Sequence, residues 1–294
     1  MTYEFEKATI KKRLGDVYNL LKETKCILAG GALTSLFSGK EINDWDIYCT
    51  SKESISEVFT SAWGVSESCY LEPFDLVVKF ATERSLLCVG KNGGEKIQFI
   101  HYKTFKDAQD IFNSFDFEHC MAAYDFATEE FVFHPHFFKS LAQRKIVFNS
   151  ETDFPVVSLL RVDKYKQKGH EISKAQMLRI AFTIASKKYS SWEDVKSECS
   201  GMYGVAPDKL FDETKPFSLE EVVNQLSTIS LDSTNNIVGS PSFGECCKMI
   251  KGSACEKWVG WYDFILQELS MAENGWYKES LYDIAKQDKF NSEE

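Results

Sequence analysis

Residues 27–48 constrain the fold of this chain more than any other stretch of it. An apolar run, residues 26–29, ends at the pair Gly30-Gly31, and apolar residues then recur at helical spacing up to Phe37. The pattern predicts a strand, a glycine turn and a short helix. Because glycine has no Cβ, the backbone there can approach a phosphate closely, and the start of the helix supplies free N–H donors.

Two aspartates follow this unit. Asp44 and Asp46 flank Trp45 at the start of a second predicted strand, residues 44–48. Residues i and i+2 of a strand point to the same face, so the two carboxylates project side by side. Adjacent carboxylates repel one another unless a cation lies between them, and Mg²⁺ takes such oxygen ligands together with substrate phosphates. The stretch therefore predicts a phosphate and metal site.

The composition is that of an ordinary soluble protein. The chain has 294 residues, enough for two domains, and it is 44% hydrophobic and 27% charged. Its net charge of −10 argues against broad electrostatic binding of nucleic acid, which needs a basic face. No apolar run has transmembrane length and the N-terminus does not resemble a signal peptide, so we expect no membrane partner and a location in the cytoplasm, that of the host if the chain is viral.

The nine cysteines are scattered and include no C-x-x-C pair. This favours reduced thiols over disulfides or a zinc ribbon.

The periodicity along the chain predicts an α+β fold. After residue 22 strands dominate, and after Pro155 helical periodicity does, so we expect a mixed β-sheet domain over residues 1–150 and a helical domain over residues 151–294. The predicted hairpin turn is Asn92-Gly93-Gly94, and Ser51 is a predicted helix N-cap. The predicted helices cover residues 4–22, 55–59, 106–112 and 136–143, and the further strands residues 76–80, 86–89, 97–100 and 131–133.

The order of these features resembles the signature of the DNA polymerase β-type nucleotidyltransferase superfamily, which is a strand, a Gly-Gly pair, a helix and then Asp-x-Asp. Within it, three segments are similar, in order, to motifs of tRNA CCA-adding enzymes and bacterial poly(A) polymerases. They are GGALTSLFSGKEINDWDIY (residues 30–48), FDFEHCMAAYD (residues 115–125) and LLRVDKYKQKGHEI (residues 159–172). The resemblance implies a nucleotidyltransferase-fold sheet domain followed by a helical domain.

The resemblance also implies an activity and a set of site residues. A Mg²⁺-dependent enzyme of this kind, for which Mn²⁺ can substitute, transfers NMP from a nucleoside triphosphate and releases pyrophosphate. The acceptor would be an RNA 3′ end, or a hydroxyl of a protein or small molecule. The implied metal ligands are Asp44 and Asp46, which are also catalytic together with Asp116, and the implied substrate-binding residues are Gly30, Gly31, Thr34, Ser35, Arg161, Lys164 and Lys168.

The chain departs from the family pattern at several positions. Thr34-Ser35 stands where the family has Arg-Asp, Phe115 where it has arginine and Cys120 where it has asparagine. The apolar residues 154–157 take the place of the family's base-reading Glu-Asp-x-x-Arg. Apolar side chains cannot pair with the edge of a base, so the resemblance implies the fold and the metal site rather than CCA addition.

The third carboxylate of such a site has several candidates. The strand expected to carry it, residues 96–100, offers Gln98, whose neutral amide binds Mg²⁺ less well. Asp116 could serve the site or contact the ribose, or it could instead be the N-cap of a short helix. Asp75 is a weaker candidate that could be only a strand-edge residue.

A basic segment, residues 161–188, carries eight lysines and arginines against two acids, which indicates either a solvated helix face or a phosphate contact. Arg161, Lys164 and Lys168 fall on one side of a helix, and for them we favour the phosphate contact. His134-Pro135-His136 has no further Cys or His at ligand spacing, so we expect structural or surface residues there rather than metal ligands.

A second function remains open from the sequence. A nucleotidyltransferase-like protein that has lost catalysis could act by binding a protein or nucleic-acid partner. Gln98 in place of a carboxylate and Phe115 in place of arginine favour this alternative.

Overall fold

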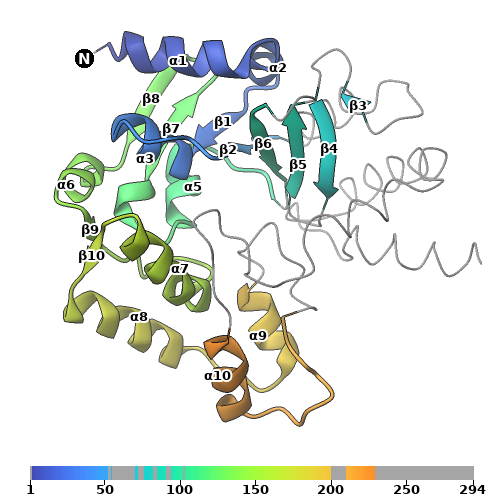
Figure 1. Cartoon of the computed structure of the whole chain (residues 1–294), viewed down its shortest axis with the longest axis vertical. Coiled ribbons are helices and arrows are strands. Elements are labelled where there is room, and N and C mark those ends of the chain that lie inside the picture. The colour runs from blue at the N-terminus through green and yellow to red at the C-terminus, as the bar shows by residue number, and fades with distance from the viewer. Residues whose placement is uncertain are drawn as a thin grey trace, which may run out of the picture. The chain divides into compact units, whose positions relative to one another are not determined.

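The computed structural model describes residues 2–51, 54, 70–71, 76–81, 85–90, 94–101, 103–199 and 210–228. In this part of the chain eight strands form one sheet in the spatial order β3-β4-β5-β6-β2-β1-β7-β8 (Figure 1). Their bounds are β1 (Ile27–Ala29), β2 (Trp45–Tyr48), β3 (Tyr70–Leu71), β4 (Leu76–Ala81), β5 (Ser85–Gly90), β6 (Lys96–Ile100), β7 (Ala122–Asp125) and β8 (Glu130–Phe133).

The sheet is mixed. Strands β2 and β6 pair in parallel, whereas β1 pairs with β2 and β7, and β5 with β4 and β6, in antiparallel fashion. Helices and a mixed sheet together confirm the predicted α+β class. The predicted β5–β6 hairpin pairs as expected, while residues 91–93 of its turn, the helix predicted over residues 55–59 and Asp75 lie outside the described residues.

The N-terminal helical segment differs from its prediction. The single helix expected over residues 4–22 is two helices, α1 (Glu4–Leu14) and α2 (Val17–Glu23). They are separated at Gly15, which has a φ of 54° that a helix interior does not allow. Both helices lie beside β7 and β8 (Figure 1), and the hydroxyls of Tyr18 and Tyr124 are 2.8 Å apart. Each helix has its own short buried side, Ile10 and Leu14 in α1 and Val17, Tyr18, Leu20 and Leu21 in α2.

The contacts of the chain divide its described residues into two compact units that alternate along the sequence. The first unit comprises residues 2–111 and 123–132, and the second comprises residues 112–122 and 133–228. The boundary predicted near residue 150 falls within the second unit and stays a prediction. The remaining elements are α3 (Gly31–Phe37), α5 (Ala108–Asn113), the 3₁₀ helix η1 (Glu118–Cys120), α6 (Phe137–Ala142), β9 (Lys145–Ile146), α7 (Pro155–Gln167), β10 (Glu171–Ile172), α8 (Lys174–Ser186), α9 (Trp192–Cys199) and α10 (Leu219–Ser227).

Helix α7 is the centre of the second unit. Proline at its first position suits a helix start, because the missing N–H has no intrahelical partner there. Val156 and Val157 pack with Trp192 of α9 in one apolar core, and Val162 and Tyr165 pack in another. The second core also holds buried residues of η1, β9 and α8, so α7 joins the segment around residue 117 to the C-terminal helices.

Two predictions from composition bear on the described residues. Cys26, Cys49, Cys88, Cys120 and Cys199 are all buried free thiols, as expected. Among the described helices none combines the length and apolar character needed to cross a bilayer.

Candidate functional site

The sheet brings the glycine pair and the aspartate pair together. Ile27 pairs with Tyr48 and Leu28 with Ile47, so the same antiparallel register, continued by one residue, places Ala29 beside Asp46. The end of β1 that leads into the glycines is therefore next to the end of β2 that carries the aspartates. Helix α3, which follows the glycines, packs on β2.

Gly30 and Gly31 differ in what the fold requires of them. Gly30 has a φ of 90°, a conformation that side-chain-bearing residues rarely adopt, and it is buried before the first turn of α3. Gly31 has no such requirement, and a Cβ added there would meet no atom within 4 Å. The fold thus explains Gly30, whereas the open space at Gly31 leaves room for a ligand to approach the backbone.

Asp44 and Asp46 are half-buried, on either side of the fully buried Trp45. The Trp45 indole N–H donates to Glu95 Oε2 at 2.7 Å, and Arg13 binds the same carboxylate through two nitrogens, at 2.6 and 2.7 Å. The Arg13 guanidinium also lies 5.2 Å from the Trp45 ring. Since Trp45 points to the opposite face, this anchor fixes the strand and directs both aspartates away from it. The donor set, two half-buried carboxylates at i and i+2, suits a divalent cation with oxygen ligands.

The position expected for a third carboxylate lies beside Asp46. Gln98 of β6 is the direct partner of Asp46 in the parallel pair, and its amide donates to Ser85 Oγ at 2.9 Å. Neighbouring strands are about 4.8 Å apart, so an acidic residue at Gln98 would be within reach of a cation held by Asp46. This chain presents a neutral amide at that place.

Thr34 and Ser35 lie on α3. The Thr34 hydroxyl is buried and donates to the Gly30 carbonyl at 3.2 Å, which ties the helix to the glycine before it. Ser35 is half-buried on the adjacent position. Thr34 therefore stabilises the glycine turn, and contact of either residue with a substrate stays a prediction.

Asp116 lies in the second unit and is buried, with 5% of its surface exposed. Its Oδ1 accepts hydrogen bonds from Thr152 Oγ1 at 3.1 Å and Ser158 Oγ at 2.8 Å, and its Oδ2 accepts one from Arg161 at 2.5 Å. The N-cap alternative is wrong, because the residue at the cap of η1 is Phe117 and it makes no side-chain cap bond. Both oxygens of Asp116 are thus engaged in holding α7 against this segment.

Arg161 and Lys164 lie on α7, and Lys168 directly follows its last residue. Arg161 pairs with Asp116, and the ammonium groups of Lys164 and Lys168 lie 5.6 and 6.0 Å from the ring of Tyr165. Lys164 is only 8% exposed. Phosphate contact by these residues stays a prediction.

Sequence reasoning missed the side chains that support these sites. Thr152 and Ser158, which hydrogen-bond Asp116, are 36 and 42 residues away from it in the sequence. Arg13 and Glu95, which anchor Trp45, are 82 residues apart. A tryptophan between two aspartates is the one local signal that could have suggested a buried anchor on the opposite face.

Comparison with known proteins gives a partial match in sequence. A family model described as "Gabija anti-defense 2 family protein" matches residues 2–144. A curated relative from Bacillus phage SPbetaL7, named Gabija anti-defense 2, is 41% identical over 235 residues. The aligned region is 79% of this chain but 56% of the relative, so the chain spans little more than half of the length of the phage protein.

Comparison with solved structures gives CCA-adding enzymes at low identity. The Thermotoga maritima enzyme complexed with tRNA has a TM-score of 0.47 at 13% identity, covering 77% of this chain and 54% of that one. A CCA-adding enzyme in complex with ATP has a TM-score of 0.48 at 12% identity, covering 77% and 53%. The Bacillus stearothermophilus enzyme in complex with CTP has a TM-score of 0.43 at 14% identity, covering 92% and 71%. None of these likenesses assigns an activity to this chain.

Proposed function

We propose that this chain is a divalent-metal-dependent nucleotidyltransferase that counteracts a bacterial defence, the role that the name of its phage relative states for that protein. Asp44 and Asp46 would hold Mg²⁺, or Mn²⁺ in its place, and the backbone at Gly30 and Gly31 would bind the triphosphate. The bound ion would activate the attacking hydroxyl and offset charge on the transferred phosphoryl group.

One observation carries the proposal. The register of β1 and β2 brings the glycine turn beside the two half-buried aspartates, and the fold leaves open space at Gly31. An alanine at Gly31 would cause no clash within the protein, so a ligand has room to approach the backbone at this position. A triphosphate and its metal ion are the ligand that the neighbouring carboxylates fit.

The acceptor in this proposal is a hydroxyl group on a macromolecule of the infected cell. The apolar residues at positions 154–157, where Val156 and Val157 are buried in a core, cannot read a base, so templated addition of CCA is not part of the proposal. Arg161, Lys164 and Lys168 would assist by attracting phosphate, and Asp116 would position Arg161 for this task.

Label transfer tests the enzymatic part. The full chain would be incubated with each α-labelled nucleoside triphosphate, Mg²⁺ or Mn²⁺, and a bacterial lysate. We expect transfer by the wild type and at least about a 100-fold loss in Asp44→Asn/Asp46→Asn, as is typical when metal-based charge stabilisation is removed. Treating the labelled product with RNase or protease identifies the class of acceptor.

A matched control shows that the loss belongs to the site. Asp16 is exposed at the N-cap position of α2, where its side chain makes no cap hydrogen bond. Asp16→Asn should therefore keep full transfer. No transfer from any nucleotide by the wild type, with either metal, would overturn the enzymatic proposal.

A second candidate is a catalytically impaired protein that acts by binding a partner, and the neutral Gln98 beside Asp46 favours it. Phage plaque counts on cells that carry the Gabija defence, with and without this chain, separate the two. Rescue that Asp44→Asn/Asp46→Asn abolishes supports the enzyme, and rescue that the variant keeps, without label transfer, supports the binding protein. If the wild-type chain does not rescue plaques, the proposed anti-defence role is wrong. The label-transfer experiment then still tests the proposed enzymatic activity on its own.

A further inference from the structure

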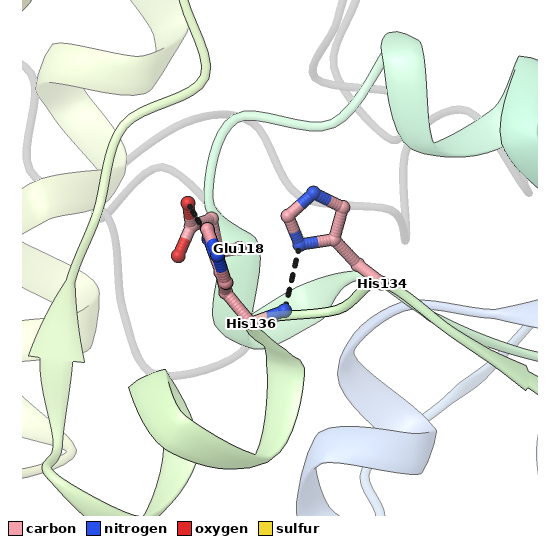
Figure 2. Close-up of side chains that lie close together, drawn as sticks. All are labelled: Glu118, His134 and His136. Carbon is pink, nitrogen blue, oxygen red and sulfur yellow. Dashed lines mark hydrogen bonds and ion pairs between the residues drawn. The ribbon is translucent and has the colours of Figure 1, made fainter.

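The second unit contains a cluster of two histidines and a glutamate. Glu118 begins η1, His134 follows β8 and His136 precedes α6. A nitrogen from each imidazole and a carboxylate oxygen all lie within 4.8 Å of one another. Figure 2 shows the three side chains gathered over the turn that leads into α6. Within the described residues this is the place where three such potential ligands converge.

The backbone around the cluster is fixed by hydrogen bonds. The N–H of Glu118 donates to the Val147 carbonyl at 3.0 Å, and that of His134 donates to the Met121 carbonyl at 3.0 Å. Ser140 Oγ donates to Glu118 Oε2 at 2.8 Å, which orients the carboxylate. Such support from outside the ligand set is typical of metal sites, where it reduces the cost of assembling the ligands.

The side chains that would bind an ion interact with one another. His136 Nδ1 donates to Glu118 Oε1 at 3.1 Å, and the His136 N–H donates to His134 Nδ1 at 3.3 Å (Figure 2). An ion bound to Glu118 and His136 would replace the first interaction, whereas the second, from the backbone N–H of His136, can persist if His134 binds the ion through Nε2. The side chain of His136 is 59% exposed and that of Glu118 is 17% exposed, so the cluster is open to solvent and an ion can reach it.

The ligand types select the class of ion. Imidazole nitrogens suit Zn²⁺, Co²⁺ and Ni²⁺, whereas Mg²⁺ and Ca²⁺ favour oxygen ligands. Two histidines and one carboxylate also leave a coordination position for water.

We propose that Glu118, His134 and His136 form a binding site for one Zn²⁺-class transition-metal ion, separate from the Asp44 and Asp46 site. The ion would tie the turn before α6 to the segment that carries Asp116. The site is built from residues of the second unit alone, so it does not depend on the proposed nucleotidyltransferase function.

Titration of the metal-free full chain with Zn²⁺, followed by calorimetry, tests the proposal. In the Asp44→Asn/Asp46→Asn chain, which lacks the other proposed metal ligands, we expect one ion per chain, a rise in melting temperature on binding, and a Co²⁺ complex whose visible absorption reports the coordination geometry. His134→Gln and Glu118→Gln should each weaken binding by at least about 100-fold, and Ser140→Ala by about 10-fold, the size of loss found for residues that orient a ligand.

Two control variants complete the test. Glu171→Gln changes an exposed glutamate of the same unit, and Asp44→Asn/Asp46→Asn changes the carboxylates of the sheet; both should keep Zn²⁺ affinity. Affinity that is unchanged in His134→Gln and Glu118→Gln would overturn the proposal, as would a wild-type chain that binds no Zn²⁺. Circular dichroism shows whether a variant is folded. If a ligand variant is unfolded, the Zn²⁺ affinity of Ser140→Ala, which keeps all three ligands, tests the proposal instead.

Discussion

Asp44 and Asp116 are both aspartates of matched motifs, yet the structure surrounds them in different ways. Asp44 is half-buried at the edge of a strand whose anchor, Trp45, lies on the other face. Asp116 is buried, with two hydroxyls and a guanidinium on its two oxygens. A carboxylate that is engaged by three side chains stabilises the fold and is not available to a ligand. The comparison separates this structural aspartate from the half-buried Asp44, which we propose as a metal ligand.

The largest effect should come from breaking the Asp116 pair. Asp116→Ala leaves the Arg161 charge without its buried partner, which typically costs about 3–5 kcal/mol in the free energy of unfolding. Asp44→Ala should cost less than about 1 kcal/mol, as expected away from buried networks. Urea unfolding of both variants measures the difference, and equal losses would remove the contrast between the two aspartates.

A substitution at Ser158 tests whether the hydroxyl groups around Asp116 contribute to stability in addition to the Arg161 guanidinium. Ser158→Ala removes a 2.8 Å hydrogen bond to the buried carboxylate, and such bonds to charged groups contribute about 1.5–3 kcal/mol. Ser186→Ala, at an exposed serine, is the matched control and should change stability by less than about 0.5 kcal/mol. If both serines behave alike in urea unfolding, the hydrogen bond from Ser158 does not help to hold Asp116.

Gly30 and Gly31 allow the same contrast between stability and ligand binding to be tested in the sheet. Gly30→Ala should cost about 1–3 kcal/mol because its φ of 90° is strained for alanine. Gly31→Ala should leave stability within about 0.5 kcal/mol but weaken nucleotide binding, since its methyl group would fill the open space. Thermal unfolding and nucleotide titration of each variant check both halves. A Gly31→Ala protein that binds nucleotide normally would contradict the proposed triphosphate site.

Acid should destabilise the folded chain through His101, next to the last residue of β6. Burial lowers the pKa of His101, which follows β6, from 6.5 to about 3. The unfolded chain therefore binds this proton first as the pH falls below 6.5, and the folded state loses up to about 1.4 kcal/mol per pH unit until about pH 3. His101→Leu should reduce the slope of unfolding free energy against pH by about one proton between pH 6 and pH 4. An unchanged slope would mean that His101 is protonated in the folded chain.

The smallest effect on stability should come from Asp44→Asn. Removing one of two like charges at i and i+2 should raise stability by about 0.5 kcal/mol or less without metal. Mg²⁺ should raise the melting temperature of the wild type and not that of the variant. If Mg²⁺ stabilises both proteins equally, these carboxylates do not hold the ion.

The sequence predicted local features of the fold well and distant ones poorly. The strand, glycine turn, helix and second strand of residues 27–48 each have a signal within a few residues, and all four are present. The break at Gly15 was missed because the apolar periodicity continues through it, although the backbone does not.

For the candidate site, the sequence named the strand that carries Gln98, and the structure adds that Gln98 pairs with Asp46. The environment of Asp116 could not be predicted, because its partners come from distant positions that no local pattern links to it. The same holds for Glu118 and His136, which are 18 residues apart and meet only through the turn before α6.

The alternation of the two units along the chain limits how the protein can be divided. A fragment that ends near residue 150 would keep Asp116 but lose Thr152, Ser158 and Arg161, so it would expose a carboxylate that evolved to be enclosed. The segment matched by the family model ends at residue 144, before all three partners. Gene fusions, split reporters and truncated expression products should therefore retain residues 112–228 as one piece, and a library that shuffles this chain with its relatives should place no crossover within them.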